Sequence, residues 1–161
     1  MFQDLKKKLL TGQVTFGDAL PKALPQLRGK ISDDKLLWLA SELQGYSNAI
    51  EFYQNQSHNL PKYRIVPGAL FLMTPDGTLN ELKHPYAKRT DYFLSAPVAW
   101  LEEFARLQGD ISLVEVPELT AFMSGGGGGV VCQTKKYELR RIIANFRNEF
   151  LALLDQVEPT N

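Results

Sequence analysis

The apolar repeat within residues 135–157 constrains the fold more than any other stretch of this chain. Apolar side chains recur there at three- and four-residue steps, which bring them to one side of an α-helix. The stretch therefore predicts a long amphipathic helix with one side buried, and Thr134 is its expected N-cap. The repeat consists of Leu139, Ile142, Ile143, Phe146, Phe150, Leu153, Leu154 and Val157.

Two shorter helices are predicted near the start of the chain. Residues 2–11 place apolar side chains at helical spacing. Thr15 is the expected N-cap of the second helix, because its side-chain oxygen can accept a hydrogen bond from the first turn. Pro21 and Pro25 are expected to bend or shorten this helix, since proline lacks an N–H and crowds the preceding turn.

Two further helices are expected, one on each side of the middle of the chain. The first is "ISDDKLLWLASELQGY", capped by Ser32 or Asp33 and ended by Gly45. The second begins after Ser95, its expected cap, and runs through "APVAWLEEFARLQ". The expected apolar face of the first of these helices consists of Leu36, Leu37, Ala40 and Leu43.

The middle of the chain contains strand-like patterns. "YRIVPG" and "ALFLMTPDGT" predict two short strands, and "ISLVEV" predicts a strand with alternating side chains. "GVVCQ" is the last expected strand. Helices that flank a small β region define an α+β fold. We therefore expect N-terminal helices and a long C-terminal helix packed on a small, mainly antiparallel sheet.

Length and composition favour one ordinary domain. The chain has 161 residues, a formal net charge of zero and one cysteine, Cys132. The absence of excess positive charge disfavours strong nonspecific attraction to nucleic acid or membranes. We expect one domain over residues 1–161, no signal peptide, no membrane-spanning segment and a cytoplasmic location.

Five consecutive glycines lie between Ser124 and Val130. A phosphate-binding loop needs a glycine followed by lysine and a hydroxyl residue at the start of a helix. Here the glycines are followed by "VVCQTKK", so the nearest lysines are too far along the chain. The sequence therefore favours a flexible glycine loop over residues 124–129, without a role in phosphate binding.

Three stretches in order resemble the AbiTii-type domain of bacterial abortive-infection proteins. They are "LLWLASELQGY", "LPKYRIVPG" and "LRRIIANFRNEFLALLDQVE", and their order and spacing resemble this family across nearly the whole chain. The resemblance implies a cytoplasmic component of bacterial defence against phages. It implies no particular active site.

The first two of these stretches contain the main candidate site. Glu42, at a helix end, and Arg64, at the start of a strand, could meet in the fold, with Trp38, Tyr46 and Tyr63 around them. One interpretation is a general acid/base or anion-binding pair. The favoured interpretation is a partly buried ion pair that joins the helix to the sheet. Breaking such a pair singly would cost ~3–5 kcal/mol.

The last helix supplies a second candidate site. Lys136, Arg140 and Arg147 lie along roughly one side of the expected helix, with Asn148 nearby. Such residues could contact a nucleotide or a nucleic-acid backbone. Because Glu138 and other acidic residues interrupt this basic stretch, a solvated helix face is the favoured interpretation.

No catalytic or metal-binding pattern is recognisable. His58, His84 and Cys132 are too isolated to predict a zinc site or an activated thiol. The favoured function is therefore a non-enzymatic sensing, regulatory or protein-interaction module of an antiphage system, without a cofactor. It would bind a protein partner, a second copy of itself or a small signal. The alternative is a small effector enzyme or a protein that binds nucleic acid or nucleotides, in the same defence context.

Overall fold

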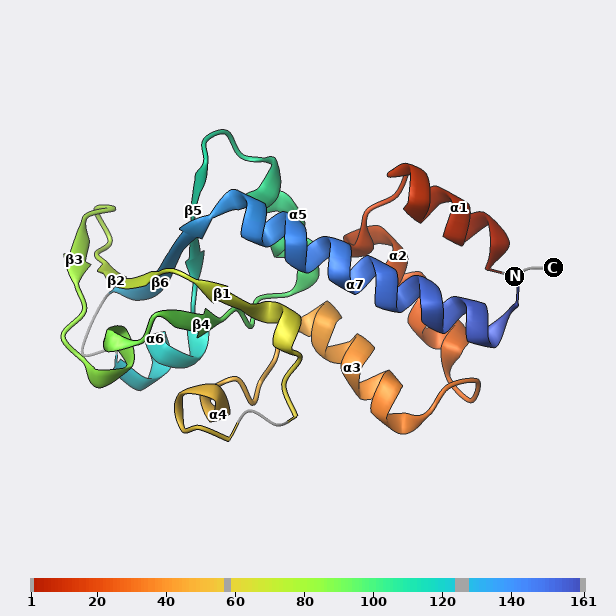
Figure 1. Ribbon diagram of the computed structural model, residues 1–161, viewed down its shortest axis with the longest axis horizontal. Coiled ribbons are helices and arrows are strands. Elements are labelled where there is room, and N and C mark those ends of the chain that lie inside the picture. Colours follow the sequence, from red (N-terminus) through yellow and green to blue (C-terminus); the bar gives the residue numbers. More distant parts are fainter. Residues whose placement is uncertain (1, 57–58, 124–127, 160–161) are drawn as a thin grey trace.

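The computed structural model describes residues 2–56, 59–123 and 128–159 (Figure 1). Its α-helices are α1 (Gln3–Thr11), α2 (Phe16–Leu27), α3 (Asp33–Gln44), α4 (Ile50–Tyr53), α5 (Val98–Arg106), α6 (Pro117–Met123) and α7 (Lys136–Val157). Two 3₁₀ helices are η1 (Lys62–Arg64) and η2 (Pro85–Lys88). The strands are β1 (Ile65–Pro67), β2 (Ala69–Met73), β3 (Leu79–Glu81), β4 (Asp91–Phe93), β5 (Ile111–Glu115) and β6 (Gly129–Lys135).

The long helix α7 runs along the molecule and joins its two ends (Figure 1). Helices α1, α2 and α3 surround its C-terminal half, where Phe146, Phe150 and Leu154 are buried in a helical core. The strands lie at its N-terminal end, where Leu139 and Ile142 enter a second core. The α+β class and the long C-terminal helix are thus as the sequence predicts. In the described part of the chain, no helix combines the length and apolar character needed to cross a bilayer.

Two small antiparallel sheets make up the β region. One has the strand order β3-β2-β6-β5, and the other pairs β1 with β4. Register partners share a face of a sheet, so Leu70, Cys132 and Val114 lie together on one face. All three are buried in the core beneath this face. The four-stranded sheet therefore packs on the rest of the molecule by one side, the inner face.

Local capping explains where two helices begin. The Thr15 hydroxyl oxygen accepts a hydrogen bond from Asp18 N, and the Ser32 hydroxyl oxygen accepts one from Lys35 N. Both caps are as predicted. Helix α2 continues through both Pro21 and Pro25 to Leu27, so the expected shortening is wrong, because the buried face on the helical core offsets the missing hydrogen bonds.

Two other predicted caps are wrong. Thr134 lies within β6 and donates from its hydroxyl to Pro67 O, so α7 begins after Lys135 without a side-chain cap. Ser95 donates to the Glu118 carboxylate, and α5 begins after Pro97. In both cases a partner distant in sequence engages the hydroxyl.

The predicted apolar face of α3 is also partly wrong. Leu37 is 68% exposed, whereas Leu39 and Glu42 are fully buried. The buried side of α3 is therefore centred between these last two residues. A carboxylate can lie on this side only because its charge is paired, as described below.

Part of the predicted glycine loop lies outside the described residues, namely positions 124–127. The last two glycines are described, and the strand β6 begins at Gly129, which pairs with Met73. A side chain at Gly128 would meet Met73 O at 3.0 Å. The expected flexible stretch therefore does not extend through residue 129, because the strand ladder holds its end.

Candidate functional site

Glu42 and Arg64 form a fully buried, bidentate ion pair. Arg64 Nε donates to Glu42 Oε2 at 2.9 Å, and a terminal guanidinium nitrogen donates to Oε1 at 2.8 Å. Glu42 comes from the last turn of α3 and Arg64 from the end of η1, and both are 0% exposed. The pair that the sequence predicted is present in the interior, where it joins α3 to the chain that enters β1.

Three aromatic side chains complete this cluster, as expected from the sequence. The Tyr46 and Tyr63 hydroxyls each donate to Glu42 Oε2 at 2.6 Å. Trp38 Nε1 in turn donates to the Tyr63 hydroxyl at 2.9 Å. Glu42 thus accepts hydrogen bonds at both carboxylate oxygens. We refer to these five residues (Trp38, Glu42, Tyr46, Tyr63 and Arg64) as the Glu42 network.

The remaining guanidinium donors bind backbone at the entrance to α5. Arg64 donates to Leu94 O at 2.7 Å and to Ala96 O at 2.6 Å. The guanidinium carbon also lies 4.9 Å from the centroid of the Tyr46 ring. Arg64 therefore connects three segments that are distant in sequence: the end of α3, the start of β1 and the segment before α5.

The electrostatics of the network favour fixed protonation states. Burial, followed by the nearby Glu42 carboxylate, raises the pKa values of the Tyr46 and Tyr63 hydroxyls. Burial alone would lower the pKa of Arg64, but the Glu42 carboxylate outweighs it, so that this pKa is raised. The phenols stay protonated and the arginine stays charged at neutral pH. The network thus holds its protons rather than exchanging them.

The surface hollows beside the network do not reach its charges. One is lined by Trp38 and Tyr46, and the other by Trp38 and Tyr63. Neither Glu42 nor Arg64 lines either of them. A bound molecule would therefore contact aromatic rings there and not the ion pair. This arrangement matches the architectural interpretation of these residues.

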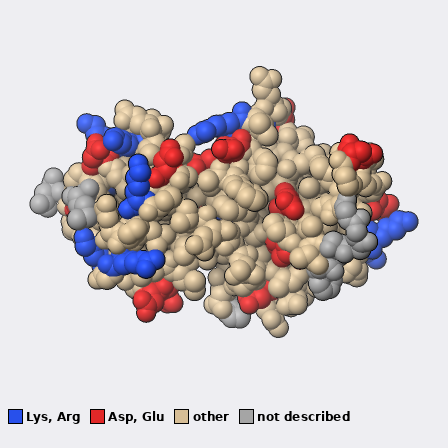
Figure 2. Space-filling view, turned by 180° about the vertical axis from the view of Figure 1, so that it is seen from behind, with Lys and Arg blue, Asp and Glu red and all other residues tan. Residues whose placement is uncertain are grey.

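The basic residues predicted on the last helix are not gathered on one surface. Lys136 is 2% exposed, and its ammonium donates to the backbone oxygen of Leu107. Lys136 therefore does not contribute to the predicted basic face, because its side chain is bound to the segment that precedes β5. Arg140 is exposed and Arg147 is partly exposed. Figure 2 shows the side of the molecule opposite to that in Figure 1, and there also Lys and Arg are interspersed with Asp and Glu.

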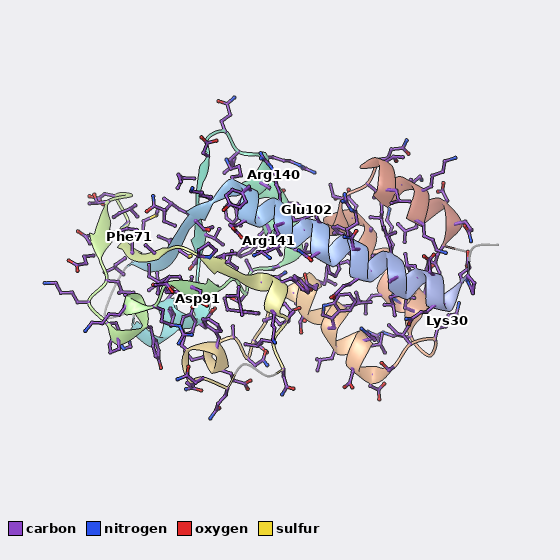
Figure 3. All side chains as sticks on the ribbon, in the orientation of Figure 1. Lys30, Phe71, Asp91, Glu102, Arg140 and Arg141 are labelled. Atoms are coloured by element: carbon purple, nitrogen blue, oxygen red, sulfur yellow. The ribbon has the colours of Figure 1, made fainter. Side chains whose placement is uncertain are left out.

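Arg141, which the sequence reasoning did not single out, has a structural role. It donates to Tyr63 O at 3.1 Å and to Ile65 O at 2.9 Å, and its Nε donates to Glu138 at 2.8 Å. Figure 3 shows Arg141 on α7 facing β1, with Arg140 beside it in sequence. Nothing in the sequence distinguishes the structural residue, Arg141, from its exposed neighbour, Arg140.

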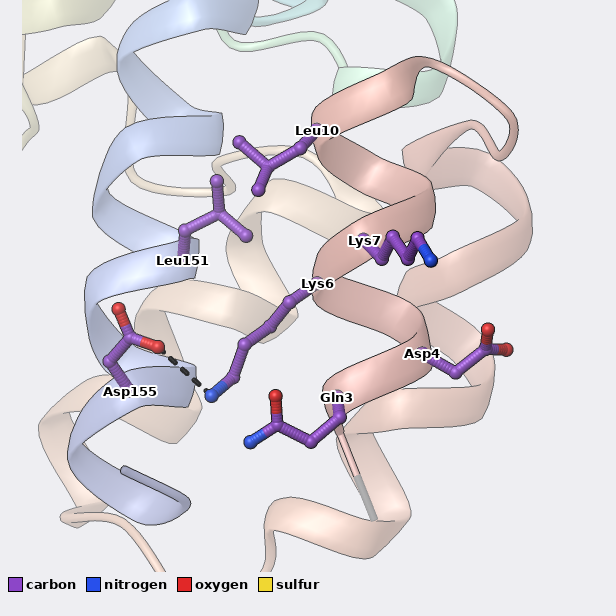
Figure 4. Close-up of a pocket in the computed structure, with 7 residues that line it drawn as sticks. All are labelled: Gln3, Asp4, Lys6, Lys7, Leu10, Leu151 and Asp155. Carbon is purple, nitrogen blue, oxygen red and sulfur yellow. Dashed lines mark ion pairs between the residues drawn. The ribbon is translucent and has the colours of Figure 1, made fainter. Parts of the chain in front are cut away.

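The groove between α1 and α7 is a further hollow (Figure 4). Lys6 crosses it, and its ammonium lies 2.9 Å from Asp155 Oδ1 and donates to Glu158 O at 2.6 Å. Leu10 and Leu151 form the apolar part of the groove. Because Lys6 is engaged by α7 and the chain that follows it, its contacts hold α1 against α7.

Among the described residues, neither Cys132 nor His84 provides a reactive centre. Cys132 is fully buried, and burial raises the pKa of its thiol to about 12. His84 Nδ1 accepts from Tyr86 N at 3.2 Å at the start of η2. His58 lies outside the described residues. Among the described residues, no group of His, Cys, Asp and Glu side chains is arranged to hold a metal ion.

The other side of the four-stranded sheet, the outer face, carries apolar side chains that belong to neither core. Ile111 is 47% exposed and Leu79 is 37% exposed, whereas Val131 is buried between its strand neighbours. Phe71, labelled in Figure 3 at the sheet end of the molecule, is half-buried. The apolar residues of the outer face are Phe71, Met73, Leu79, Ile111, Leu113 and Val131, and charged residues such as Glu81, Glu115 and Lys135 share the face with them.

The sequence contained only a weak signal for this face. In "ISLVEV" the two valines that enter the core are apolar, but so are the first and third residues, which lie on the outer face. The strand is therefore not strictly amphipathic. The same is true of "ALFLM" in β2. A strand that is apolar on both sides usually has both sides covered. Here the described helices pack on the inner face alone, which periodicity could not reveal.

Comparisons with known proteins identify no relative. No family model, no curated protein and no solved structure matches this chain. Function must therefore be argued from the geometry of the molecule.

Proposed function

We propose that this chain is a non-enzymatic protein-interaction module and that the outer face is its binding surface. The observation that carries the proposal is the row of apolar side chains, such as Phe71 and Leu113, that lies outside both cores. Contiguous exposed apolar surface on a protein typically marks a site of association. The partner would cover this side of the sheet.

The polar residues of the chain support the same proposal. The residues with the best arrangement for acid/base chemistry, Glu42 and Arg64, are hydrogen-bonded within a buried network and line neither of the hollows beside it. The helix that was the candidate for nucleic-acid contact keeps only Arg140 and Arg147 at its surface, beside acidic Glu149. An effector enzyme or a nucleic-acid-binding protein is therefore less well supported than an interaction module.

The biological context of the proposal comes from the sequence resemblance. An AbiTii-type domain would act in the bacterial cytoplasm, as a regulatory or sensing component of an abortive-infection system. The resemblance includes the Glu42 network, since Trp38, Glu42 and Tyr46 lie in its first motif and Tyr63 and Arg64 in its second. In a domain of this type these motif residues would maintain the fold, and the interaction surface is then defined by the outer face.

A phage challenge tests the role of the outer face. Bacteria would express the wild type, Phe71→Lys on the outer face, or Leu37→Lys, a matched control at an exposed position of α3. We expect the wild type and the control to lower plaque counts equally for at least one phage. Phe71→Lys should lower this protection about tenfold, which corresponds to a loss of ~1.4 kcal/mol of binding free energy.

The folding of both variants must be checked before their activities are compared. Circular dichroism and thermal unfolding should give the same helix content and similar transition temperatures for the three proteins. If folded Phe71→Lys protects as well as Leu37→Lys does, the outer face is not the binding surface. If the wild type protects against none of the phages, the proposed defence role is wrong.

A further inference from the structure

Strand β5 is an edge of the four-stranded sheet, and one side of its backbone has no partner among the described residues. The backbone N–H and C=O groups of the even-numbered residues point toward β6. Two hydrogen bonds show this: Lys136 N donates to Asp110 O, and Val116 N donates to Val130 O. In an antiparallel ladder, bonding alternates between the two sides of a strand. The N–H and C=O groups of Ile111, Leu113 and Glu115 therefore point outward.

An exposed edge of this kind is a template for another strand. Natural edge strands are commonly protected by proline, inward-pointing charges or a bulge. Residues 111–115 contain no proline, and the ladder to β6 is regular. The residues of this strand that point inward are Ser112 and Val114, which are buried and uncharged. The edge thus has the features of a strand that pairs rather than one that avoids pairing.

The pattern of outward groups is complementary to itself. If two copies of β5 meet antiparallel around a two-fold axis at Leu113, this residue pairs with its counterpart and Ile111 pairs with the partner's Glu115. Every outward N–H of one copy then meets an outward C=O of the other, as an isologous interface requires. The same two-fold axis places both outer faces on the same side of the combined sheet.

The charges beside the edge are complementary in this register. Glu115 lies at one end of β5, and Lys135 lies on β6 beside Ile111 at the other end. Both are exposed on the outer face, and neither has an ion-pair partner in the described part of the chain. Across the two-fold axis, Glu115 and the partner's Lys135 would be two strand spacings apart, about 10 Å between Cα atoms. Their long side chains can bridge this distance over Ile111.

We propose that a second copy of this chain pairs with the first through the β5 edges, giving one continuous sheet of order β3-β2-β6-β5-β5-β6-β2-β3. The biological role of this dimer rests on the proposed function, because pairing joins the two outer faces into a single surface of twice the width. The dimer is thereby the unit that binds the partner protein. Each contact occurs twice, so a change of one residue acts at both ends of the interface.

Charge exchange tests this register. Sedimentation of the full chain at about 1 μM to 500 μM would give the Kd of the dimer. Glu115→Lys alone and Lys135→Glu alone place like charges together at both ends, and each should raise Kd about tenfold. The double variant restores opposite charges and should recover the Kd of the wild type. Glu81→Lys, an exposed glutamate on the outer face at the opposite edge, is the control and should leave Kd unchanged.

The outcomes separate this proposal from the proposed function. A wild type that stays monomeric over the whole range, or a double variant that is no better than the single ones, overturns the β5 pairing. In that case the proposed function still stands if Phe71→Lys loses phage protection. If instead the exchange behaves as expected while Phe71→Lys keeps full protection, the pairing is supported and the role of the outer face in partner binding is overturned.

Discussion

At the scale of single residues, the Glu42 network shows how polar side chains can specify a fold. Moving a carboxylate and a guanidinium out of water is costly, and their attraction compensates only when every remaining hydrogen-bonding group is satisfied. Here Glu42 accepts from Tyr46 and Tyr63, and Arg64 also binds two backbone oxygens. The motifs allowed this cluster to be anticipated, because they place an acidic residue at a helix end and a basic residue at the start of a strand, where the two could meet in the fold.

We predict that Arg64→Met lowers the free energy of unfolding by ~3–5 kcal/mol, because it leaves the Glu42 carboxylate buried without its cation. Urea denaturation would measure the loss, with Arg140→Met, an exposed arginine on α7, as the control near zero. The double variant with Glu42→Met as well should recover part of the stability, since no charge then remains unpaired. A double variant that loses the sum of both single effects would contradict this account.

Glu118 is a second residue whose environment leads to a prediction. Its Oε2 accepts from the Ser95 hydroxyl at 2.7 Å, while its Oε1 is buried without a partner among the described residues. Burial raises the pKa of this carboxyl, so the folded protein binds the proton more tightly than the unfolded chain does. Its contribution to stability is thus fully present below the unfolded pKa and is lost as the pH rises through the folded one.

Glu118→Gln, which is neutral at every pH, should therefore be more stable than the wild type at neutral pH, by about 1 kcal/mol. The advantage should shrink as the pH is lowered towards the ordinary pKa of a glutamate, about 4.3. Urea denaturation of both proteins at a series of pH values measures the difference directly. An advantage that stays constant across the series would mean that the carboxyl does not titrate with folding.

At the scale of elements, helix starts were predictable where the cap is local. Thr15 and Ser32 bind backbone N–H groups three residues ahead, and these contacts follow from sequence distance alone. Ser95 and Thr134 have the same residue types, but tertiary contacts engage their hydroxyls instead. Sequence patterns cannot weigh a local partner against one that only the folded chain brings near.

Glu102 is a cap that no local pattern could predict. It lies on α5, yet its two carboxylate oxygens accept from Phe16 N at 2.9 Å and Gly17 N at 3.1 Å, the first N–H groups of α2 (Figure 3). A carboxylate at this helix end both satisfies unpaired donors and interacts with the helix dipole. Glu102 therefore fixes α2 against α5.

We predict that Glu102→Ala destabilises the protein by about 1–2 kcal/mol, the usual cost of losing a helix cap. Glu103→Ala removes an exposed carboxylate from the next position on α5 and should change stability little. Hydrogen exchange adds a local test, because the amides of Phe16 and Gly17 should lose protection only in the first variant. Equal effects of the two substitutions would rule out the capping role.

At the scale of the whole molecule, the sequence predicted the class of the fold but not which surfaces are covered. The repeat in α7 indicated one buried side, and the structure divides that side between two cores. Strand alternation could not show that the helices pack on only one face of the sheet, because the residues of both faces in β2 and β5 are largely apolar. The outer face therefore emerged only from the register of the strands.

The connection through α7 leads to a prediction about cooperativity. Ile143 and Tyr63 are packed against both the helical core and the core beneath the sheet, so loss of one core exposes side chains of the other. We expect the chain to unfold in one transition, as a single domain. The chain has a second tryptophan, Trp100, so the test uses a Trp100→Phe background. In it, fluorescence of Trp38, which packs on the helical core, and far-ultraviolet circular dichroism should report the same midpoint in urea.

Two substitutions in α7 sharpen this test. Ile142→Ala should cost ~2–5 kcal/mol through the core beneath the sheet, and Phe150→Ala ~3–5 kcal/mol through the helical core. Although Trp38 reports on only one core, both substitutions should shift its midpoint together with that of circular dichroism. Ile142→Ala could instead shift the midpoint of circular dichroism and leave the midpoint of Trp38 fluorescence unchanged. The two ends of the molecule would then be separately stable, and α7 would only connect them.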